Sequence, residues 1–217
     1  MASSPSGSTL GIRDEVAALK RERTIDAAVE LFYDRGYQNT SLDAVAERLG
    51  VTKPFIYVHF NGKADLLAEI CSRGIASSLE AMDSVVAMPG TAMAKLGELG
   101  RRFVTAVLSS QKHIAIYTRE EKNLAPTDFE RISLMRRDFD RKLTALLQQG
   151  VAERSFAIPD IRLASLAIGG MVSWAYVWYR QQGRLNLDTV ADEMAALILA
   201  MVHAKAPPAR KPRKPKT

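Results

Sequence analysis

Two short helical patterns separated by a glycine constrain this chain more than any other feature of its sequence. Leu42, Val45 and Leu49 are spaced three and four residues apart, which places apolar side chains on one face of a helix, and Gly50 ends the pattern. A second short segment begins at Thr52, whose hydroxyl is typical of a residue that caps a helix start. The stretch therefore predicts two short helices joined by a tight turn.

The remaining sequence is also helical in pattern, and no strand pattern competes with it. Ile25, Ala28, Val29 and Phe32 form one apolar stripe in a first helix that ends before Gly36. Further helices are expected near residues 63–87, 91–109, 111–122, 127–149, 160–181 and 187–204, with Gly and Pro residues between them. The sequence predicts an all-α fold in which an N-terminal three-helix helix-turn-helix domain precedes a larger helical domain.

Charge and composition suggest how the chain is divided. We expect a disordered N-terminus over residues 1–12, the helix-turn-helix domain over 13–62, the larger domain over 63–204 and a basic disordered tail over 205–217. The tail holds six Lys and Arg residues and no Asp or Glu, which equals the whole formal net charge of +6. The high isoelectric point is therefore no sign that the first domain binds nucleic acid. The tail itself fits either a solvated appendage or a segment attracted to phosphates without sequence preference.

Several classes of protein are disfavoured by the sequence. No run of apolar residues reaches the roughly 18 that a membrane span needs, and the first residues lack the apolar core of a secretory signal. The single cysteine, Cys71, agrees with a reducing compartment such as the cytoplasm. His59, His113 and His203 lie on separate segments, and no phosphate-binding loop or nucleophile motif is present. The sequence predicts a soluble, cytoplasmic protein that is not an enzyme and has no metal site or cofactor.

The paired short helices fit a helix-turn-helix that reads DNA. A small residue, Ala46, stands where the two helices would cross, so the second helix can project its first side chains outward. That geometry suits a major groove about 12 Å wide. Thr52, Lys53, Pro54 and Phe55 are the side chains expected to face the bases.

Polar residues around the two short helices are candidates for phosphate contacts. Thr40 and Ser41 precede the first short helix, where unpaired backbone N–H groups attract anions. Tyr57, His59 and Lys63 add a phenol, an imidazole and an ammonium group after the second. Helix-turn-helix lookalikes occur in many helical proteins, so spacing alone leaves a purely structural interpretation open.

The segment TSLDAVAERLGVTKPFIYVHFNGKADLL resembles the DNA-binding domain of the tetracycline-repressor (TetR) family of bacterial regulators. The resemblance covers about residues 21–70, where the matching positions occur together in register: Gly36-Tyr37, Gly50-Val51-Thr52, Tyr57, His59-Phe60, Lys63 and Leu66-Leu67. It implies a homodimer that reads a palindromic DNA operator and releases it when a small molecule binds. The larger domain would then be a ligand-binding and dimerisation domain.

The resemblance also assigns roles to individual residues. The family's phosphate contacts correspond to Thr40, Thr52, Tyr57, His59 and Lys63 of this chain. Lys53 and Phe55 occupy base-reading positions, although Pro54 and Phe55 stand where the family often has small residues. A non-specific architectural DNA-binding protein is the alternative suggested by the basic tail.

The run LASLAIGGMVSWAYVWY, residues 163–179, is apolar around its whole circumference, so we expect it to be buried on nearly all sides. In a dimer that pairs its last two helices, this helix and residues 187–203 would form the interface. The adjacent glycines Gly169 and Gly170 suggest that a partner helix or a ligand approaches the backbone closely.

The second half of the chain looks similar to TetR-like regulators that respond to acyl-coenzyme A thioesters. Such a ligand needs an apolar tunnel and cations for its phosphates, which Arg101 and neighbouring arginines could supply unless they form pairs on a solvated face. A planar aromatic or drug-like ligand held between Tyr117, Trp174 and Trp178 is the competing class, and Met171 lies on the same expected face as the tryptophans. Core packing is the structural alternative for these aromatic residues.

Overall fold

The computed structural model describes residues 8–203. The basic tail and the first seven residues of the predicted disordered N-terminus lie outside the described residues. The described residues form helices and contain no strand, so the predicted all-α fold is confirmed. The chain divides into two compact units, unit 1 (Met1–Ile75 and Ser110–Ser133) and unit 2 (Ala76–Ser109 and Leu134–Thr217).

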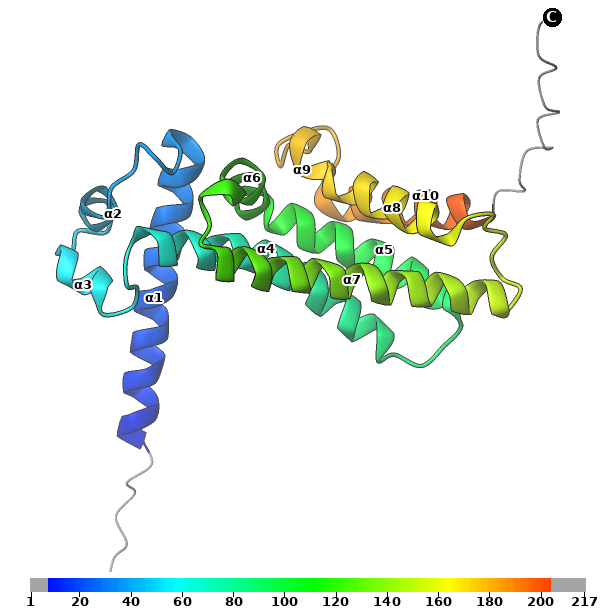
Figure 1. The fold of residues 1–217 in the computed structure, drawn as a ribbon, viewed down its shortest axis with the longest axis horizontal. Coiled ribbons are helices and arrows are strands. Elements are labelled where there is room, and N and C mark those ends of the chain that lie inside the picture. Colours follow the sequence, from blue (N-terminus) through cyan, green and yellow to red (C-terminus); the bar gives the residue numbers. More distant parts are fainter. Residues whose placement is uncertain (1–7, 204–217) are drawn as a thin grey trace, which may run out of the picture. The chain divides into compact units, whose positions relative to one another are not determined.

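Unit 1 holds the helix-turn-helix and the helices that support it (Figure 1). Its elements are α1 (Ser8–Arg35), α2 (Leu42–Leu49), α3 (Lys53–Tyr57), the first part of α4 (Lys63–Val86), α6 (Gln111–Glu120), the 3-10 helix η1 (Glu121–Asn123) and the first part of α7 (Pro126–Ala152). The predicted apolar stripe of α1 lies in the core of unit 1, where Ile25, Ala28, Val29 and Phe32 are all buried. They share one core with Ile56, Phe60, Leu66, Leu67, Ile116, Tyr117 and Ile132.

The first helix begins at Ser8, earlier than the expected start at Arg13. Residues 13–24 are rich in Ala, Leu, Lys, Arg and Glu, which favour helix, and contain no Pro or Gly that would end it. Local propensity is therefore enough to extend α1 beyond the stripe that packs on the core.

In the turn between α2 and α3, Gly50 ends α2 as the sequence predicts, whereas Thr52 stands at the N-cap of α3 without the predicted capping hydrogen bond from its hydroxyl. Gly50 adopts a left-handed φ of 66°, a conformation that glycine adopts without steric strain. Its N–H donates to the carbonyl of Glu47 at 3.0 Å, and the next N–H, from Val51, donates to the carbonyl of Ala46 at 3.0 Å. The Ser41 hydroxyl accepts from the N–H of Ala44 and caps the other end of α2.

Unit 2 is a bundle whose largest contact joins α5 and α10. Its elements are the last part of α4, α5 (Ala92–Ser109), the last part of α7, α8 (Ile161–Ser173), α9 (Ala175–Trp178) and α10 (Leu187–His203). Gly100 of α5 lets the helices approach closely, because a Cβ atom at this position would lie 3.0 Å from the Cα of Ala195. Phe103 and Phe139 pack with ring centroids 4.5 Å apart and join α5 to α7.

The apolar run 163–179 differs from the prediction in two ways. The helix is interrupted at Trp174, which separates α8 from α9. Only one side of the run is buried, through Ile168, Val172 and Ala175, whereas Leu163 and Leu166 are 64% and 62% exposed. Unit 2 covers one face of the run, so the single chain supplies only part of the burial that the sequence predicts.

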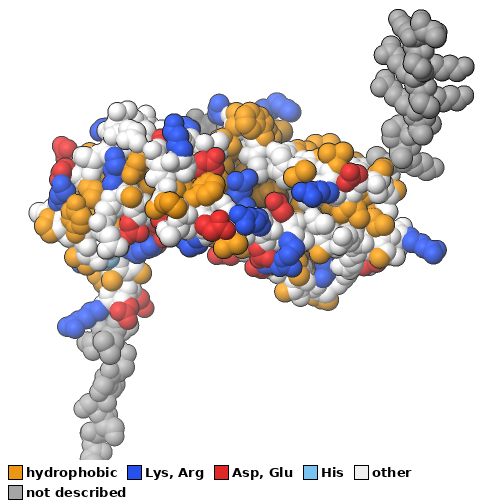
Figure 2. Space-filling model, viewed as in Figure 1, with side chains coloured by type: hydrophobic (Ala, Val, Ile, Leu, Met, Phe, Trp, Pro, Cys, Tyr) orange, Lys and Arg blue, Asp and Glu red, His pale blue; other side chains and the backbone are white. Residues whose placement is uncertain are grey.

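Length and composition alone would allow the window Ile161–Trp178 to cross a membrane. One such window is weak evidence for a span, and this one is interrupted at Trp174 between α8 and α9. Figure 2 shows the apolar surface that results, with hydrophobic side chains gathered over α9 and along α8.

Candidate nucleic-acid interface and effector groove

The helix α3 is anchored on one side and exposed on the other. Ile56 is fully buried, and Phe60, just beyond the helix end, is also in the core of unit 1. Lys53, Pro54 and Tyr57 face outward and are exposed. Because Ile56 packs into the core on one side, α3 presents a polar and aromatic rim to solvent on the other.

Lys53, one of the predicted base-reading residues, is engaged with α2. Its ammonium group donates to the Asp43 carboxylate at 3.0 Å. The hydrogen bond to Asp43 and the charge of that carboxylate raise the pKa of Lys53, so the side chain carries its full positive charge. The pair is exposed on both sides, and DNA can therefore compete for the lysine through a solvated contact.

Phe55, the other predicted base-reading residue, is only half-exposed. It packs against the core of unit 1 and meets the ring of His59 edge-on, with centroids 5.9 Å apart. The ammonium of Lys20 in α1 lies 5.6 Å from the centroid of the Phe55 ring. Phe55 thus links α3 to both its own C-terminal turn and to α1, and only part of its ring faces outward.

The predicted phosphate contacts fall into two groups. Ser41, Thr52 and Tyr57 are exposed, and His59 is half-buried beside Phe55. Thr40 is instead buried, and its hydroxyl donates to the Gly36 carbonyl at 2.9 Å, with the Leu31 carbonyl at 3.3 Å. The Thr40 side chain therefore fastens the turn before α2 to the end of α1, because its oxygen faces inward rather than to the surface.

Lys63 fastens the same turn from the start of α4. Its ammonium group donates to the carbonyls of Tyr37 and Thr40, both at 2.9 Å, and lies 4.2 Å from the centroid of the Tyr37 ring. A third contact comes from the end of α6, where Glu120 accepts from the backbone N–H of Tyr37 at 3.5 Å. The turn that sets the entry angle of α2 is held from two other elements of unit 1.

A network of ion pairs ties α1 to α4 behind the helix-turn-helix. Glu69 pairs with Arg21 at 2.8 Å and with Arg73 at 3.0 Å, and Arg73 also binds Glu22. The hydrogen bond from Arg21, together with the one from Arg73, lowers the pKa of Glu69, although partial burial opposes the shift. Glu22 likewise has a lowered pKa because Arg73 donates to it. Both carboxylates are therefore charged near neutral pH.

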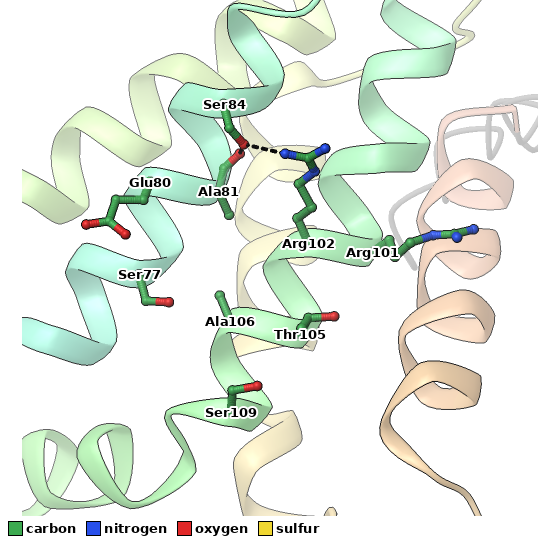
Figure 3. Close-up of a pocket in the computed structure, with 9 residues that line it drawn as sticks. All are labelled: Ser77, Glu80, Ala81, Ser84, Arg101, Arg102, Thr105, Ala106 and Ser109. Atoms are coloured by element: carbon green, nitrogen blue, oxygen red, sulfur yellow. Dashed lines mark hydrogen bonds between the residues drawn. The ribbon is translucent and has the colours of Figure 1, made fainter.

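The predicted effector-binding residues do not gather into one site within unit 2. An open groove of about 500 Å³ lies between α4 and α5 (Figure 3). Arg101 belongs to its lining but points away from it and pairs with Asp192 of α10 at 3.0 Å. Arg102 reaches across the groove to the Ser84 hydroxyl at 3.0 Å. The groove is lined by the hydroxyl groups of Ser77, Ser84, Thr105 and Ser109 and by the Glu80 carboxylate. The Arg102 guanidinium at its rim also pairs with Glu98 at 2.6 Å.

The aromatic residues predicted to hold a ligand have different environments. Tyr117 is buried in the core of unit 1. Trp174 and Trp178 of unit 2 are 61% and 49% exposed, and Met171 is half-buried. Trp174 meets Tyr176 edge-on, with centroids 6.4 Å apart. These contacts indicate a core role for Tyr117 and a surface role for the tryptophans in the single chain.

Sequence reasoning missed two sets of residues that shape these sites. Asp43 and Glu120 make contacts that helical spacing does not signal, because the partner of each lies on a different element of unit 1. The groove hydroxyls had a weak signal: Ser77 and Ser84 are seven residues apart, and Thr105 and Ser109 are four apart, so each pair shares one helix face.

Two family models match this chain and together cover most of it. Residues 25–70 match the model described as "Bacterial regulatory proteins, tetR family", which includes α2, α3 and the turn between them. Residues 89–202 match "Tetracyclin repressor-like, C-terminal domain". The second match alone spans more than half of the chain.

Individual proteins of known name are similar over nearly the whole length. The chain is 28% identical over 182 residues to the HTH-type transcriptional repressor KstR2 of Rhodococcus jostii, which covers 83% of this chain and 89% of that protein. It is 24% identical over 190 residues to the fatty acid metabolism regulator protein of Bacillus subtilis, which covers 86% of this chain and 97% of the relative.

A solved structure with the same fold is that of AibR in complex with isovaleryl coenzyme A and operator DNA. It matches with a TM-score of 0.72 and 24% identity, covering 83% of this chain and 98% of AibR. At this identity the likeness concerns the fold.

Proposed function

Because the chain belongs to the tetR family of bacterial regulatory proteins, we propose that it is a cytoplasmic transcriptional repressor that binds a palindromic operator as a homodimer. A small hydrophobic effector would release it from DNA. The single observation that supports this function is the arrangement of α3, which is anchored by Ile56 while Lys53, Pro54 and Tyr57 are exposed. Residues 13–62 would form the DNA-binding domain and residues 63–204 the effector and dimerisation domain.

Lys53 and Phe55 are the proposed base-reading residues. Lys53 would exchange the Asp43 carboxylate for a base edge or a phosphate, and the exposed part of the Phe55 ring would meet an apolar group such as a thymine methyl. The proposed phosphate contacts are Ser41, Thr52, Tyr57 and His59, with Thr40 and Lys63 acting chiefly by holding the turn that precedes α2. Phosphate contacts set the register, and base contacts set the sequence preference.

Dimerisation would use the apolar faces of α8 and α10. Leu163 and Leu166 on α8 and Leu197 on α10 are each more than half exposed in the single chain. A Cβ atom at Gly169 or Gly170 would meet nothing within 4 Å, so no contact within the described chain accounts for these glycines. A second copy packed on this surface would bury the leucines and could approach the glycine backbone closely.

An acyl-coenzyme A thioester is the proposed effector class. The similarity to a regulator of fatty acid metabolism favours it, and Arg102 at the groove, which pairs with Glu98 at 2.6 Å, would exchange that carboxylate for a phosphate group of the ligand. A planar aromatic ligand is the second candidate, favoured by the exposed rings of Trp174 and Trp178. A thermal-shift screen with acyl-coenzyme A thioesters, free acids and aromatic drugs separates them, since a ligand at 100 times its dissociation constant stabilises by about 2.7 kcal/mol.

The DNA-binding proposal is tested by selecting bound duplexes from a randomised library in the presence of bulk genomic DNA. We expect an inverted repeat that is bound roughly 10³-fold or more tightly than the competitor. Lys53→Ala should relax the preference at one position of each half-site, whereas Arg184→Ala, which removes the same charge from an exposed position in unit 2, should not. Recovery of no preferred sequence would contradict the repressor function and favour a non-specific architectural protein.

A further inference from the structure

The first turns of α1 extend beyond the part of the helix that unit 1 needs for its core. The buried side chains of α1 begin at Thr24, and every side chain from Arg13 to Lys20 is exposed. Figure 1 shows this end of α1 continuing past α2 and α3. Packing within unit 1 therefore gives no reason for the residues that the exposed turns carry.

Charges on these turns are segregated by face. At 3.6 residues per turn, Arg13, Val16, Ala17 and Arg23 all lie within about 60° of Lys20 around the helix axis. The acidic residues of the same segment lie more than about 110° away from it, and they are Asp14, Glu15 and Glu22. One face of α1, the α1 basic face (Arg13, Lys20 and Arg23), is consequently free of acidic residues.

The contacts of unit 1 define where this face points. The ammonium of Lys20 lies 5.6 Å from the ring centroid of Phe55, so the α1 basic face is on the same side of α1 as α3. Glu22, on another face, binds Arg73 of α4 instead. Within residues 8–203 no ion pair engages Arg13, Lys20 or Arg23. Their positive charges are available beside the exposed rim of α3.

We propose that the α1 basic face contacts DNA phosphates that flank the half-site bound by α3. This inference rests on the proposed DNA-binding function and adds a second, sequence-independent contact surface to it. Arg13 lies seven residues before Lys20, so it extends about 10 Å further along α1. That distance corresponds to roughly three base-pair steps of the duplex.

In vitro selection with the full-length protein first recovers the preferred inverted repeat. The test then compares two duplexes that contain it, one that ends at the edges of the repeat and one with several extra base pairs on each side. We expect Arg13→Ala to weaken binding to the longer duplex by roughly three- to tenfold, and to leave binding to the shorter duplex unchanged. On the longer duplex, the negative slope of log K against log salt should also become shallower by about 0.9 for each phosphate contact that is lost.

Two controls separate a flanking contact from a general loss of charge or fold. Arg184→Ala removes one positive charge from unit 2 and should bind both duplexes like the unmodified protein, and Arg13→Lys should restore the salt slope. Equal weakening on both duplexes, or no change on either, would overturn the inference while leaving the proposed DNA binding intact. An unmodified protein that selects and binds no duplex would overturn the proposed function itself.

Discussion

Lys63 joins the start of α4 to the turn before α2 through one ammonium group. It donates to two carbonyls of the turn before α2 and lies over the ring of Tyr37. Hydrogen bonds from a charged donor contribute more than neutral ones. At the residue scale, the orientation of the helix-turn-helix therefore depends on a side chain outside it.

Lys63→Met removes the ammonium while keeping an unbranched apolar stem. We expect it to lower the free energy of unfolding by about 1–3 kcal/mol, because the Tyr37 and Thr40 carbonyls lose their charged donor. Urea unfolding followed by circular dichroism measures this change. Lys122→Met, at an exposed position of η1, is the matched control and should have little effect. Equal stabilities of the two variants would contradict the role of Lys63 in holding the turn.

Glu69 makes the stability of unit 1 depend on pH. Its pKa is lowered from the ordinary value of 4.5, chiefly by the hydrogen bond from Arg21. The unfolded chain therefore takes up a proton at higher pH than the folded protein does. The stabilising contribution is fully present above about pH 4.5 and is lost as pH falls through the lowered folded pKa.

We therefore expect the free energy of unfolding of Glu69→Gln to depend less steeply on pH below about 4.5 than that of the unmodified protein. Urea titrations at a series of acidic pH values provide the measurement. An unchanged acid dependence in the variant would show that other carboxylates carry it.

Sequence spacing identified the residues around α3 but not their hydrogen-bond partners. The exposure of Lys53 and the burial of Ile56 follow from helical periodicity, which is local information. The inward hydroxyl of Thr40 and the pairing of Lys53 with Asp43 depend on how separate segments meet in three dimensions. Spacing also cannot show that Phe55 is half-covered by its neighbours in the folded unit.

At the scale of helices, most boundaries were predictable because Gly and Pro end helices through their own backbone geometry. The helix α2, which ends before Gly50, is the clearest example. The interruption at Trp174 was not predicted, since apolar periodicity continues through it without a proline. The close contact of α5 with α10 was also not predicted from the sequence, because the residues around Gly97 and Gly100 do not show which helix packs against them.

Gly100 and Gly97 provide a matched test of that contact. A Cβ atom at Gly100 would lie 3.0 Å from both the Cα and the Cβ of Ala195, whereas at Gly97 it would lie 3.4 Å from the flexible end of Leu199. Alanine favours a helix interior by about 1 kcal/mol over glycine at either site. Overpacking against backbone costs about 1–3 kcal/mol and should act at Gly100 alone.

We therefore expect Gly97→Ala to be more stable than Gly100→Ala by about 1–3 kcal/mol. Thermal unfolding of the two variants under identical conditions measures the difference. A Gly100→Ala variant as stable as Gly97→Ala would mean that α10 can move away from α5 without loss.

At the scale of the whole molecule, the single chain leaves an apolar surface that its own folding does not explain. Leu163, Leu166 and Leu197 are exposed on α8 and α10, whereas most of the ion pairs lie elsewhere in the two units. The run 163–179 is apolar around its circumference, and the expected burial on nearly all sides is not reached within one chain. A pattern of apolar residues indicates that a face must be covered and does not say which chain covers it.

Leu166→Glu tests whether a second copy covers this face. A carboxylate at the centre of an apolar isologous interface appears twice, once from each subunit, so we expect the dimer to dissociate at micromolar concentration. Light scattering after size-exclusion chromatography gives the mass directly. Leu134→Glu, at a similarly exposed leucine on α7, is the matched control and should leave the mass unchanged.

Loss of the dimer should also change DNA binding in a defined way. A dimer that binds two linked half-sites has an affinity about 10²–10⁴-fold higher than that of one half-site contact, through effective concentration alone. Leu166→Glu should therefore bind the inverted repeat about as weakly as a single half-site, while its contact residues in unit 1 are unaltered. If the variant stayed dimeric, or bound the full repeat with undiminished affinity, a surface other than α8 and α10 would have to join the two subunits.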